Sequence, residues 1–272
     1  MPARSAGALR CSGRRLAVAL ALLPAAAAAA PLRLTADVAL DAHATVHVTA
    51  TNDGAAPVED VRPDVAWERA TTAGEPLASL AAGASHTWAF ALPPPPGPGT
   101  FAATIRATYR AGARTERAVV AEVVATPGAP PSPVEATLRV EPVAGYGTSR
   151  VTLDDRSDQP VVGRVVVLLG AELATEPESR AVQIAPRGRT EVPIDVRDVA
   201  AHPGDRLPIT VLFEFEIEGV HHAVVRTAAL PIADASRAPV RPLIVGAAAL
   251  AVAVAIAAGA VARTRRGRAV AG

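Results

Sequence analysis

The chain has 272 residues, which is enough for one large domain or two of ordinary size. Half of the residues are hydrophobic but only 3% are aromatic, and the 25 prolines and 20 glycines favour short strands and turns over long helices. The formal net charge of +1 supplies no field that would attract nucleic acid, so no nucleic-acid partner is expected.

The only cysteine is Cys11, which lies in a segment that we expect to be removed after export. The mature protein is therefore predicted to have no disulfide, no thiolate metal site and no cysteine nucleophile.

The first 30 residues have the three parts of a secretory signal peptide. Four arginines form a basic start, and an apolar run begins at Leu16. Pro24 and the alanines up to Ala30 then supply a helix break and small residues for a peptidase. An uncleaved membrane anchor is the alternative, and the shortness of the apolar run argues against it. We therefore predict a signal peptide over residues 1–30.

Residues 243–262 form a run of 20 without a charged side chain. A helix of this length spans about 30 Å, which is the thickness of the hydrocarbon core of a bilayer. Four arginines follow within residues 263–268, and the positive-inside rule then places the C-terminus in the cytoplasm. A buried, Ala-rich helix of a soluble domain would not explain an uninterrupted run closed by arginines. The prediction is a single-pass protein of the cell membrane, with its N-terminal part extracytoplasmic and the lipid bilayer contacting residues 243–262.

A third possibility leaves the fate of this helix open. Residues 230–234 read Leu-Pro-Ile-Ala-Asp, which is similar to a sortase site without its Thr-Gly pair. The helix would then be cleaved off after export.

Residues 125–133 form a Pro-rich linker that divides the exported part in two. The predicted organisation has one β-sandwich module over residues 32–124 and a second over residues 134–232. A stalk over residues 233–242 leads to the helix, and residues 263–272 form a basic cytoplasmic tail.

Both halves have the period of β-strands. Apolar residues at every second position of residues 209–217 alternate with Thr210, Leu212, Glu214 and Glu216, which predicts a strand with one buried and one solvated face. Glu218 and Gly219 are then expected to turn the chain into a hairpin partner. Residues 101–109 form the matching strand of the first half.

The two halves also resemble each other in their turns. Residues 52–58 read Asn-Asp-Gly-Ala-Ala-Pro-Val, and residues 155–161 read Asp-Arg-Ser-Asp-Gln-Pro-Val 103 positions later. Gly83 and Gly188 precede matching strands, and the offset drifts to about 106 towards the C-terminal ends of the halves. We infer a duplicated module of about seven strands, the pattern of an immunoglobulin-like sandwich. The predicted fold is all-β: two tandem immunoglobulin-like β-sandwiches plus one C-terminal transmembrane α-helix.

These turn residues carry a family resemblance. An Asn/Asp turn, then Pro-Val and an extended strand, then a Gly, then Pro-Gly leading into an aromatic-bearing strand resembles bacterial CARDB-like and related fibronectin- or immunoglobulin-like surface modules. Residues 46–61 are the better match, since the second copy lacks the Asn and the Gly of the turn. The resemblance implies adhesion, scaffolding or spacing at a cell surface, and it brings no catalytic residues.

Three aspartates form a candidate calcium site. Asp154, Asp155 and Asp158 supply carboxylate oxygens close together, although not with the spacing of a twelve-residue calcium loop. Aspartates are equally what a tight turn uses to bond its own backbone.

Aromatic and histidine residues give two weaker candidates. Trp67 stands at a strand end and is the one aromatic residue expected to contact a carbohydrate ligand, whereas Trp88 has the alternation of a core residue. His221 and His222 are adjacent and should point to opposite sides of a strand, where one of them could pair with Glu216. No metal ligand set, cofactor site, nucleophile elbow, zinc motif or phosphate loop is recognised, so no catalysis is expected.

The predicted function is that of a membrane-anchored interaction or scaffold protein, for adhesion or for assembly of envelope complexes with other envelope proteins. The alternative is a carbohydrate- or calcium-binding accessory module of an envelope enzyme or transporter.

Overall fold

The computed structural model describes residues 31–40, 44–68 and 70–234. Within these residues the regular structure is entirely β, and none of it is a helix long and apolar enough to cross a membrane. The predicted signal peptide, the transmembrane helix over residues 243–262 and the basic tail lie outside the described residues.

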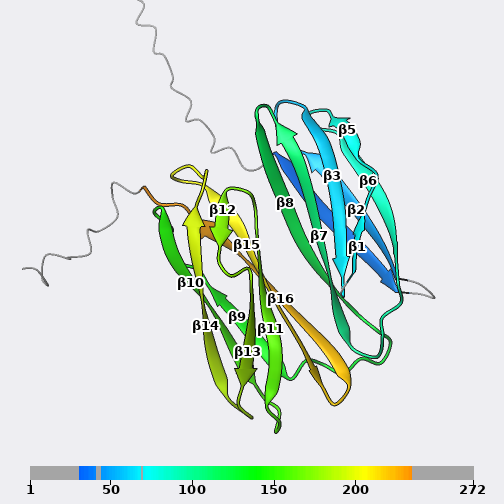
Figure 1. Ribbon diagram of the computed structural model, residues 1–272, viewed down its shortest axis with the longest axis vertical. Coiled ribbons are helices and arrows are strands. Elements are labelled where there is room, and N and C mark those ends of the chain that lie inside the picture. The colour runs from blue at the N-terminus through cyan, green and yellow to red at the C-terminus, as the bar shows by residue number, and fades with distance from the viewer. Residues whose placement is uncertain (1–30, 41–43, 69, 235–272) are drawn as a thin grey trace, which may run out of the picture.

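The strands form two bodies of eight strands each, which lie side by side in Figure 1. We call them module 1 (residues 32–125) and module 2 (residues 134–231). The strands of module 1 are β1 (Leu32–Leu40), β2 (Ala44–Asn52), β3 (Val58–Trp67), β4 (Ala70–Ala73), β5 (Leu77–Leu80), β6 (Ser85–Leu92), β7 (Thr100–Ala111) and β8 (Arg114–Ala125). The strands of module 2 are β9 (Val134–Arg139), β10 (Tyr146–Asp155), β11 (Val161–Leu169), β12 (Leu173–Thr175), β13 (Ser179–Ile184), β14 (Arg189–Asp198), β15 (Arg206–Ile217) and β16 (Val220–Pro231).

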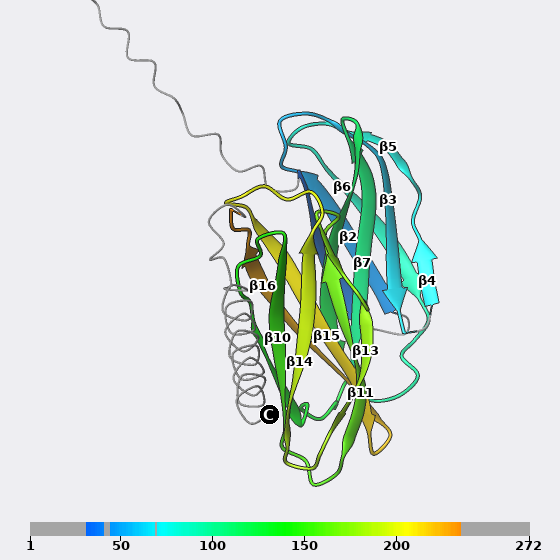
Figure 2. The same cartoon turned by 60° about the vertical axis from the view of Figure 1, so that its left-hand side comes forward.

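Each module is a sandwich of two antiparallel sheets of the general immunoglobulin-like type, and Figure 2 shows the layers from a second direction. Module 1 pairs β1-β2-β6 in one sheet and β4-β3-β7-β8 in the other, with β5 also on β3. Module 2 pairs β9-β10-β14-β12 and β13-β11-β15-β16. The pairing scheme therefore repeats, except that β4 joins β3 in module 1 whereas β12 joins β14 in module 2.

The similarity of the two modules extends to individual backbone hydrogen bonds. The amide of Asn52 donates to the carbonyl of Ala84 at 2.9 Å, and the amide of Asp155 donates to the carbonyl of Gly188 at 2.9 Å. The residues before these acceptors, Gly83 and Arg187, both have a positive φ, 72° and 51°. Gly188 therefore corresponds to Ala84, and the expected match of Gly188 with Gly83 is off by one residue. Arg187 occupies the left-handed position that glycine fills in module 1.

Each sandwich buries its own core. In module 1 the inward residues of β7 are Phe101, Ala103, Ile105 and Ala107, all 0% exposed. In module 2 the core includes the predicted alternating residues Ile209, Val211, Phe213 and Phe215 of β15. Glu218 and Gly219 form the predicted turn between β15 and β16, with positive φ of 53° and 74°.

The prediction of one solvated face along β15 was wrong at two positions. Thr210 and Leu212 point away from the core of their own sandwich, yet they are only 7% and 3% exposed. Leu212 packs on Ala102 of β7, because module 1 covers this part of the sheet. Glu214 and Glu216, further along the strand, retain more exposed positions. Strand alternation therefore predicted the core of each module but not the contact between the modules.

Candidate functional site

The two modules are joined where the start of β7 meets the start of β16. The His221 ring nitrogen Nδ1 lies 2.7 Å from the Thr100 carbonyl oxygen, and its ring stacks on Phe101 with centroids 4.6 Å apart and planes 5° from parallel. The amide of Ala223 donates to the Thr100 hydroxyl at 2.9 Å, and the amide of His221 donates to the Pro98 carbonyl at 3.2 Å. Backbone bonds, a ring nitrogen and a ring stack together fix this joint.

Gly99 is required at the joint. A Cβ built on Gly99 would lie 2.0 Å from the carbonyl oxygen of His221, a contact no side chain could make. Its φ of 139° also lies outside the range that other residues favour. The Pro-Gly element before β7 therefore lets the two backbones approach each other.

An apolar contact continues from the joint. Ala102 of β7, Leu212 of β15 and Ala223 of β16 form a small buried cluster, with Val166 and Val225 packed against it. The interface is thus made of small and aliphatic side chains on the outer faces of the two sheets that face each other.

Acidic side chains gather at the other end of the interface. The Tyr109 hydroxyl donates to Glu116 at 2.8 Å, and burial, followed by this bond, holds the pKa of Tyr109 far above its ordinary value. Burial is also the main cause that raises the pKa of Glu172 in module 2, and the nearby charge of Glu116 in module 1 adds to it. Arg117 acts in the opposite direction on the same carboxyl.

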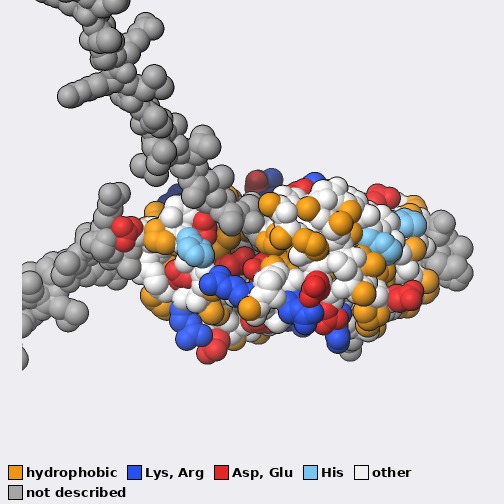
Figure 3. Space-filling view, turned by 90° about the horizontal axis from the view of Figure 1, so that it is seen from above, with side chains coloured by type: hydrophobic (Ala, Val, Ile, Leu, Met, Phe, Trp, Pro, Cys, Tyr) orange, Lys and Arg blue, Asp and Glu red, His pale blue; other side chains and the backbone are white. Residues whose placement is uncertain are grey.

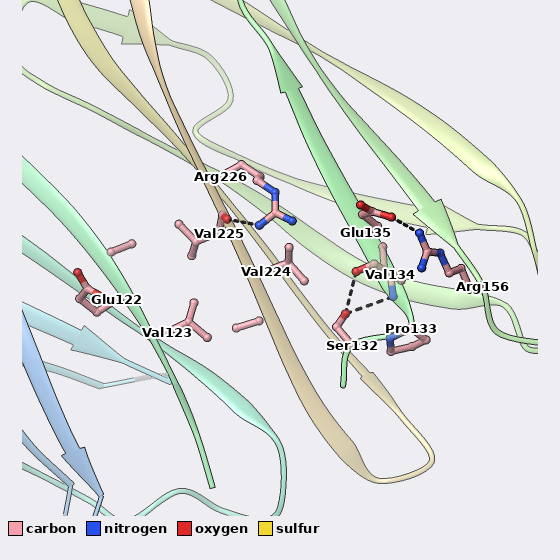
Figure 4. Close-up of a pocket in the computed structure, with 12 residues that line it drawn as sticks. Glu122, Val123, Ser132, Pro133, Val134, Glu135, Arg156, Val224, Val225 and Arg226 are labelled. Atoms are coloured by element: carbon pink, nitrogen blue, oxygen red, sulfur yellow. Dashed lines mark hydrogen bonds and ion pairs between the residues drawn. The ribbon is translucent and has the colours of Figure 1, made fainter. Parts of the chain in front are cut away.

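Between the modules lies an open groove of about 640 Å³, drawn in Figure 4. Its volume is in the range of ligand-binding pockets, about 300–1,000 Å³. β8 forms one side with Ala121, Glu122 and Val123, and the linker and β9 form the other side around Ser132 and Val134. Residues 223–226 of β16 form its floor. We call this the inter-module groove.

Arg226 donates hydrogen bonds to two edge strands inside the groove. Its Nε donates to the Ala136 carbonyl of β9 at 2.7 Å, and its Nη1 donates to the Val225 carbonyl of β16 at 2.9 Å. These carbonyls belong to edge strands of the two sheets of module 2, so a single guanidinium bonds one carbonyl on each edge. On the same side, Glu135 forms an ion pair with Arg156.

The three candidate aspartates do not come together as a cation site. Asp154 accepts two bonds from Arg189, at 2.6 and 3.1 Å, and this bonding lowers the pKa of Asp154. Asp158 pairs with Arg187 at 2.6 Å. Within residues 31–40, 44–68 and 70–234, no group of three or more His, Cys, Asp or Glu side chains could hold a metal ion.

Asp155 is a turn residue instead. It is 4% exposed, and its Oδ1 accepts the amide of Ser157 at 2.8 Å, while its Oδ2 is buried without a hydrogen-bond partner. Asn52, at the corresponding position of module 1, uses its oxygen for the amide of Gly54 and its nitrogen for the carbonyls of Ala56 and Leu80. The turn chemistry that the sequence offered as the alternative to calcium is therefore what the fold uses.

Trp67 is a core residue. It is 1% exposed and its ring lies 5.8 Å from that of Phe101, so the expectation that it contacts a ligand does not fit its place. It ends β3, which faces inward at this point, and a strand end alone does not expose a side chain. Trp88 is 7% exposed, as expected of a core residue, and its indole nitrogen donates to the Glu75 carbonyl at 2.8 Å.

The histidines take roles that the sequence did not predict. His221 lies opposite Glu216 in the hairpin, but its ring turns to module 1 rather than to that carboxylate. His222 is 1% exposed and stacks on Phe215 with centroids 5.0 Å apart. Burial lowers the pKa of His222, and the neighbouring His221 adds to this. The sequence signal at the joint is the Pro-Gly element at residues 98–99, which the family resemblance includes only as the element leading into the aromatic-bearing strand.

Comparisons with known proteins show distant likeness alone. No protein-family model matches the chain, and no curated protein matches it. A Salmonella alpha-2-macroglobulin mutant is 14% identical with a TM-score of 0.32, covering 74% of this chain and 16% of that one. Red sea bream transglutaminase is 12% identical with a TM-score of 0.26, covering 73% and 31%. A Porphyromonas gingivalis protein of unknown function is 13% identical with a TM-score of 0.25, covering 72% and 100%.

The chain thus spans about a sixth of the macroglobulin it matches. These neighbours contain all-β modules of the immunoglobulin-like type, and likeness at this distance transfers no activity to the chain.

Proposed function

We propose that the chain is a membrane-anchored extracytoplasmic interaction or scaffold protein, serving adhesion or the assembly of envelope complexes, without catalysis. Residues 1–30 direct export, and residues 243–262 hold the two modules at the outer side of the membrane. The modules are CARDB-like surface modules in this proposal, and their partners are other envelope proteins.

The observation that carries the proposal is the joint between the modules. A flexible pair of domains needs only a linker, whereas here Thr100, Phe101 and His221 fix one module against the other. A fixed pair presents one continuous surface, with the inter-module groove in the middle. Such a surface suits shape-complementary contact with another protein.

The surface charge supports the same use. Acidic and basic side chains are interspersed on the face shown in Figure 3, as expected of a soluble projection rather than of a surface with a field of one sign. Most of the ion pairs are exposed, for example Arg33–Asp53 and Arg110–Glu59, and contribute little to stability.

The carbohydrate- or calcium-binding alternative has no observation in its favour. The tryptophan that would have stacked on a sugar is buried, and the three aspartates have separate partners.

A labelling experiment tests the proposed topology, because the chain has one cysteine and it lies in the predicted signal peptide. We expect Ala113→Cys, in the exposed hairpin of module 1, to react with a membrane-impermeant maleimide in intact spheroplasts. Thr264→Cys in the predicted tail should react only after lysis. The reverse pattern would overturn the proposal.

The interaction itself is tested with the same Ala113→Cys chain. A bifunctional thiol-reactive cross-linker applied to intact spheroplasts should join it to another envelope protein. A chain that is exposed outside but yields no cross-linked product from any exposed position of either module would contradict the scaffold role.

A further inference from the structure

One strand edge at the inter-module groove is open. β8 ends the sheet β4-β3-β7-β8, and within the described residues it pairs with β7 alone. An edge strand presents backbone N–H and C=O groups at every second residue, and these can pair with another extended chain. β8 is 12 residues long and contains no proline, and its residues 121–123 face the groove.

On the other two strand edges at the groove, four backbone polar groups already have partners within the chain. Arg226 bonds the carbonyls of Val225 and Ala136, as described above. The amide of Ala223 is bonded to Thr100, and the amide of Val134 is bonded to the hydroxyl of Ser132 at 3.2 Å. These bonds disfavour strand addition at these positions of β9 and β16, and β8 is the strand at the groove to which an added strand is assigned.

The groove continues an existing apolar interface. Ala223 and Val225 belong both to the contact between the modules and to the lining of the groove. Val123 on β8 is 41% exposed, one of four large apolar side chains that stand out among the described residues. An added strand would extend the interface by covering Val123 and Val225.

Opposite charges line the groove, with Glu122 on the β8 side and Arg226 on the β16 floor, as Figure 4 shows. Neither is neutralised by an ion pair with a described residue. A segment that complements both carries a basic side chain beside Glu122 and an acidic one beside Arg226. Residues 1–30 and 235–272 contain arginines but no Asp or Glu, so neither end of the chain fits.

We propose that the inter-module groove binds an extended segment of another protein, which adds as a strand to β8 through alternating apolar residues and carries one basic and one acidic side chain. This assignment rests on the proposed function and names the part of the surface that recognises the partner. It is the strand-addition mode of peptide recognition.

The probe is a displayed library of random eight-residue peptides, panned against the purified full chain in detergent. Two variants with matched chemistry are compared: Val123→Arg places a bulky charge in the groove, and Val162→Arg places the same group at a 62% exposed valine of β11 outside it. We expect the enriched peptides to lose at least about tenfold in affinity for Val123→Arg and to keep it for Val162→Arg. Hydrogen exchange of residues 121–125 should slow when a peptide binds.

Glu122→Arg supplies a second test that disturbs no bonded partner. Peptides enriched on Glu122→Arg should carry an acidic residue where those enriched on the unchanged chain carry a basic one. Enrichment of no peptide, equal affinity for Val123→Arg and the unchanged chain, or protection outside β8 would overturn the assignment.

The oligomeric state shows whether a second copy of the chain, rather than another protein, occupies the groove. Sedimentation should show a monomer for the unchanged chain, whereas a dimer that Val123→Arg dissolves would mean that a second copy occupies the groove, contrary to the proposal. Peptide binding to purified chain does not depend on orientation in the membrane. If the labelling and cross-linking results hold while peptide binding fails, the groove assignment falls and the proposed function stands.

Discussion

His221 of β16 stacks on Phe101 of β7, and Phe101 in turn lies against Trp67 in the core of module 1. The inter-module joint is therefore continuous with the packed interior of one module. A substitution of His221 should therefore weaken the coupling between the two modules as well as lower local stability.

We expect His221→Ala to loosen the joint without unfolding either module. The substitution removes a ring stack worth about 0.5–1.5 kcal/mol and a hydrogen bond of similar size. Denaturant unfolding followed separately in the two modules should change from one shared transition to two, with small-angle scattering showing a wider spread of particle dimensions. His47→Ala, on an exposed position of β2, is the control and should change neither. A single shared transition in His221→Ala would contradict the role given to the joint.

Asp155→Asn should stabilise module 2. Asp155 leaves a buried carboxylate oxygen without a partner, whereas Asn52 at the same place in module 1 donates to two carbonyls. Replacing a bare oxygen with a donor should raise the free energy of unfolding by about 1 kcal/mol. The converse change, Asn52→Asp, should lower that of module 1 by about 1–3 kcal/mol. Both are measured by thermal unfolding, and a loss of stability in Asp155→Asn would refute the equivalence of the turns.

The strands and turns could be predicted because they depend on local patterns. Alternation over residues 209–217 indicated β15, and Glu218-Gly219 indicated its turn, since both signals act between near neighbours. The duplicated turns were visible for the same reason. The positive φ of Arg187 could not be predicted, because the turn sets this left-handed backbone conformation and arginine itself does not favour it.

The groove and the joint could not be predicted in this way. Thr210 and Leu212 occupy positions that alternation assigns to solvent, yet both are buried, and Leu212 packs on Ala102 of module 1. Arg226 was one arginine among many, and nothing near it in sequence indicates that it bonds Ala136, 90 positions away. Contacts between modules depend on their relative placement, which the period of a strand does not encode.

Trp67→Ala should destabilise module 1 severely and leave any surface property unchanged. The side chain is 1% exposed, and removing a buried aromatic ring of this size costs about 3–5 kcal/mol. Denaturant titration measures the loss, with Val123→Ala, which empties a partly exposed position, as a mild comparison. Trp67 fluorescence should also resist quenching by acrylamide. If acrylamide quenched Trp67 efficiently, the indole ring would lie at the surface, and contact with a ligand would again be possible.

Calcium should leave the melting temperature unchanged. Asp154 and Asp158 are already bonded to Arg189 and Arg187, so a bound cation would have to displace two guanidinium groups. Scanning calorimetry with millimolar calcium and with a chelator should give superimposable curves, since weak extracellular sites bind at about 10⁻⁴–10⁻³ M. A shift on adding calcium that disappears in Asp154→Ala would restore the calcium hypothesis.

Stability should fall as the pH drops below neutrality, and His222 should account for part of the fall. Because burial lowers the pKa of His222 in the folded chain, the unfolded chain binds a proton first. The contribution is complete above the unfolded value of about 6.5 and is lost as the pH falls through that value towards the folded one. His222→Phe keeps a ring against Phe215 and cannot be protonated, so its unfolding free energy should depend less on pH between about 7.5 and 5.5.

Taking the difference between His222→Phe and the unchanged chain isolates this residue. Glu172 acts with the opposite sign, because a raised carboxyl pKa gives stability that is lost as the pH rises through it, and it is common to both proteins. Identical slopes in His222→Phe and the unchanged chain would mean that His222 keeps its ordinary proton affinity in the fold. Its ring nitrogen Nδ1, which is buried without a hydrogen-bond partner in the structure, would then have a partner in solution.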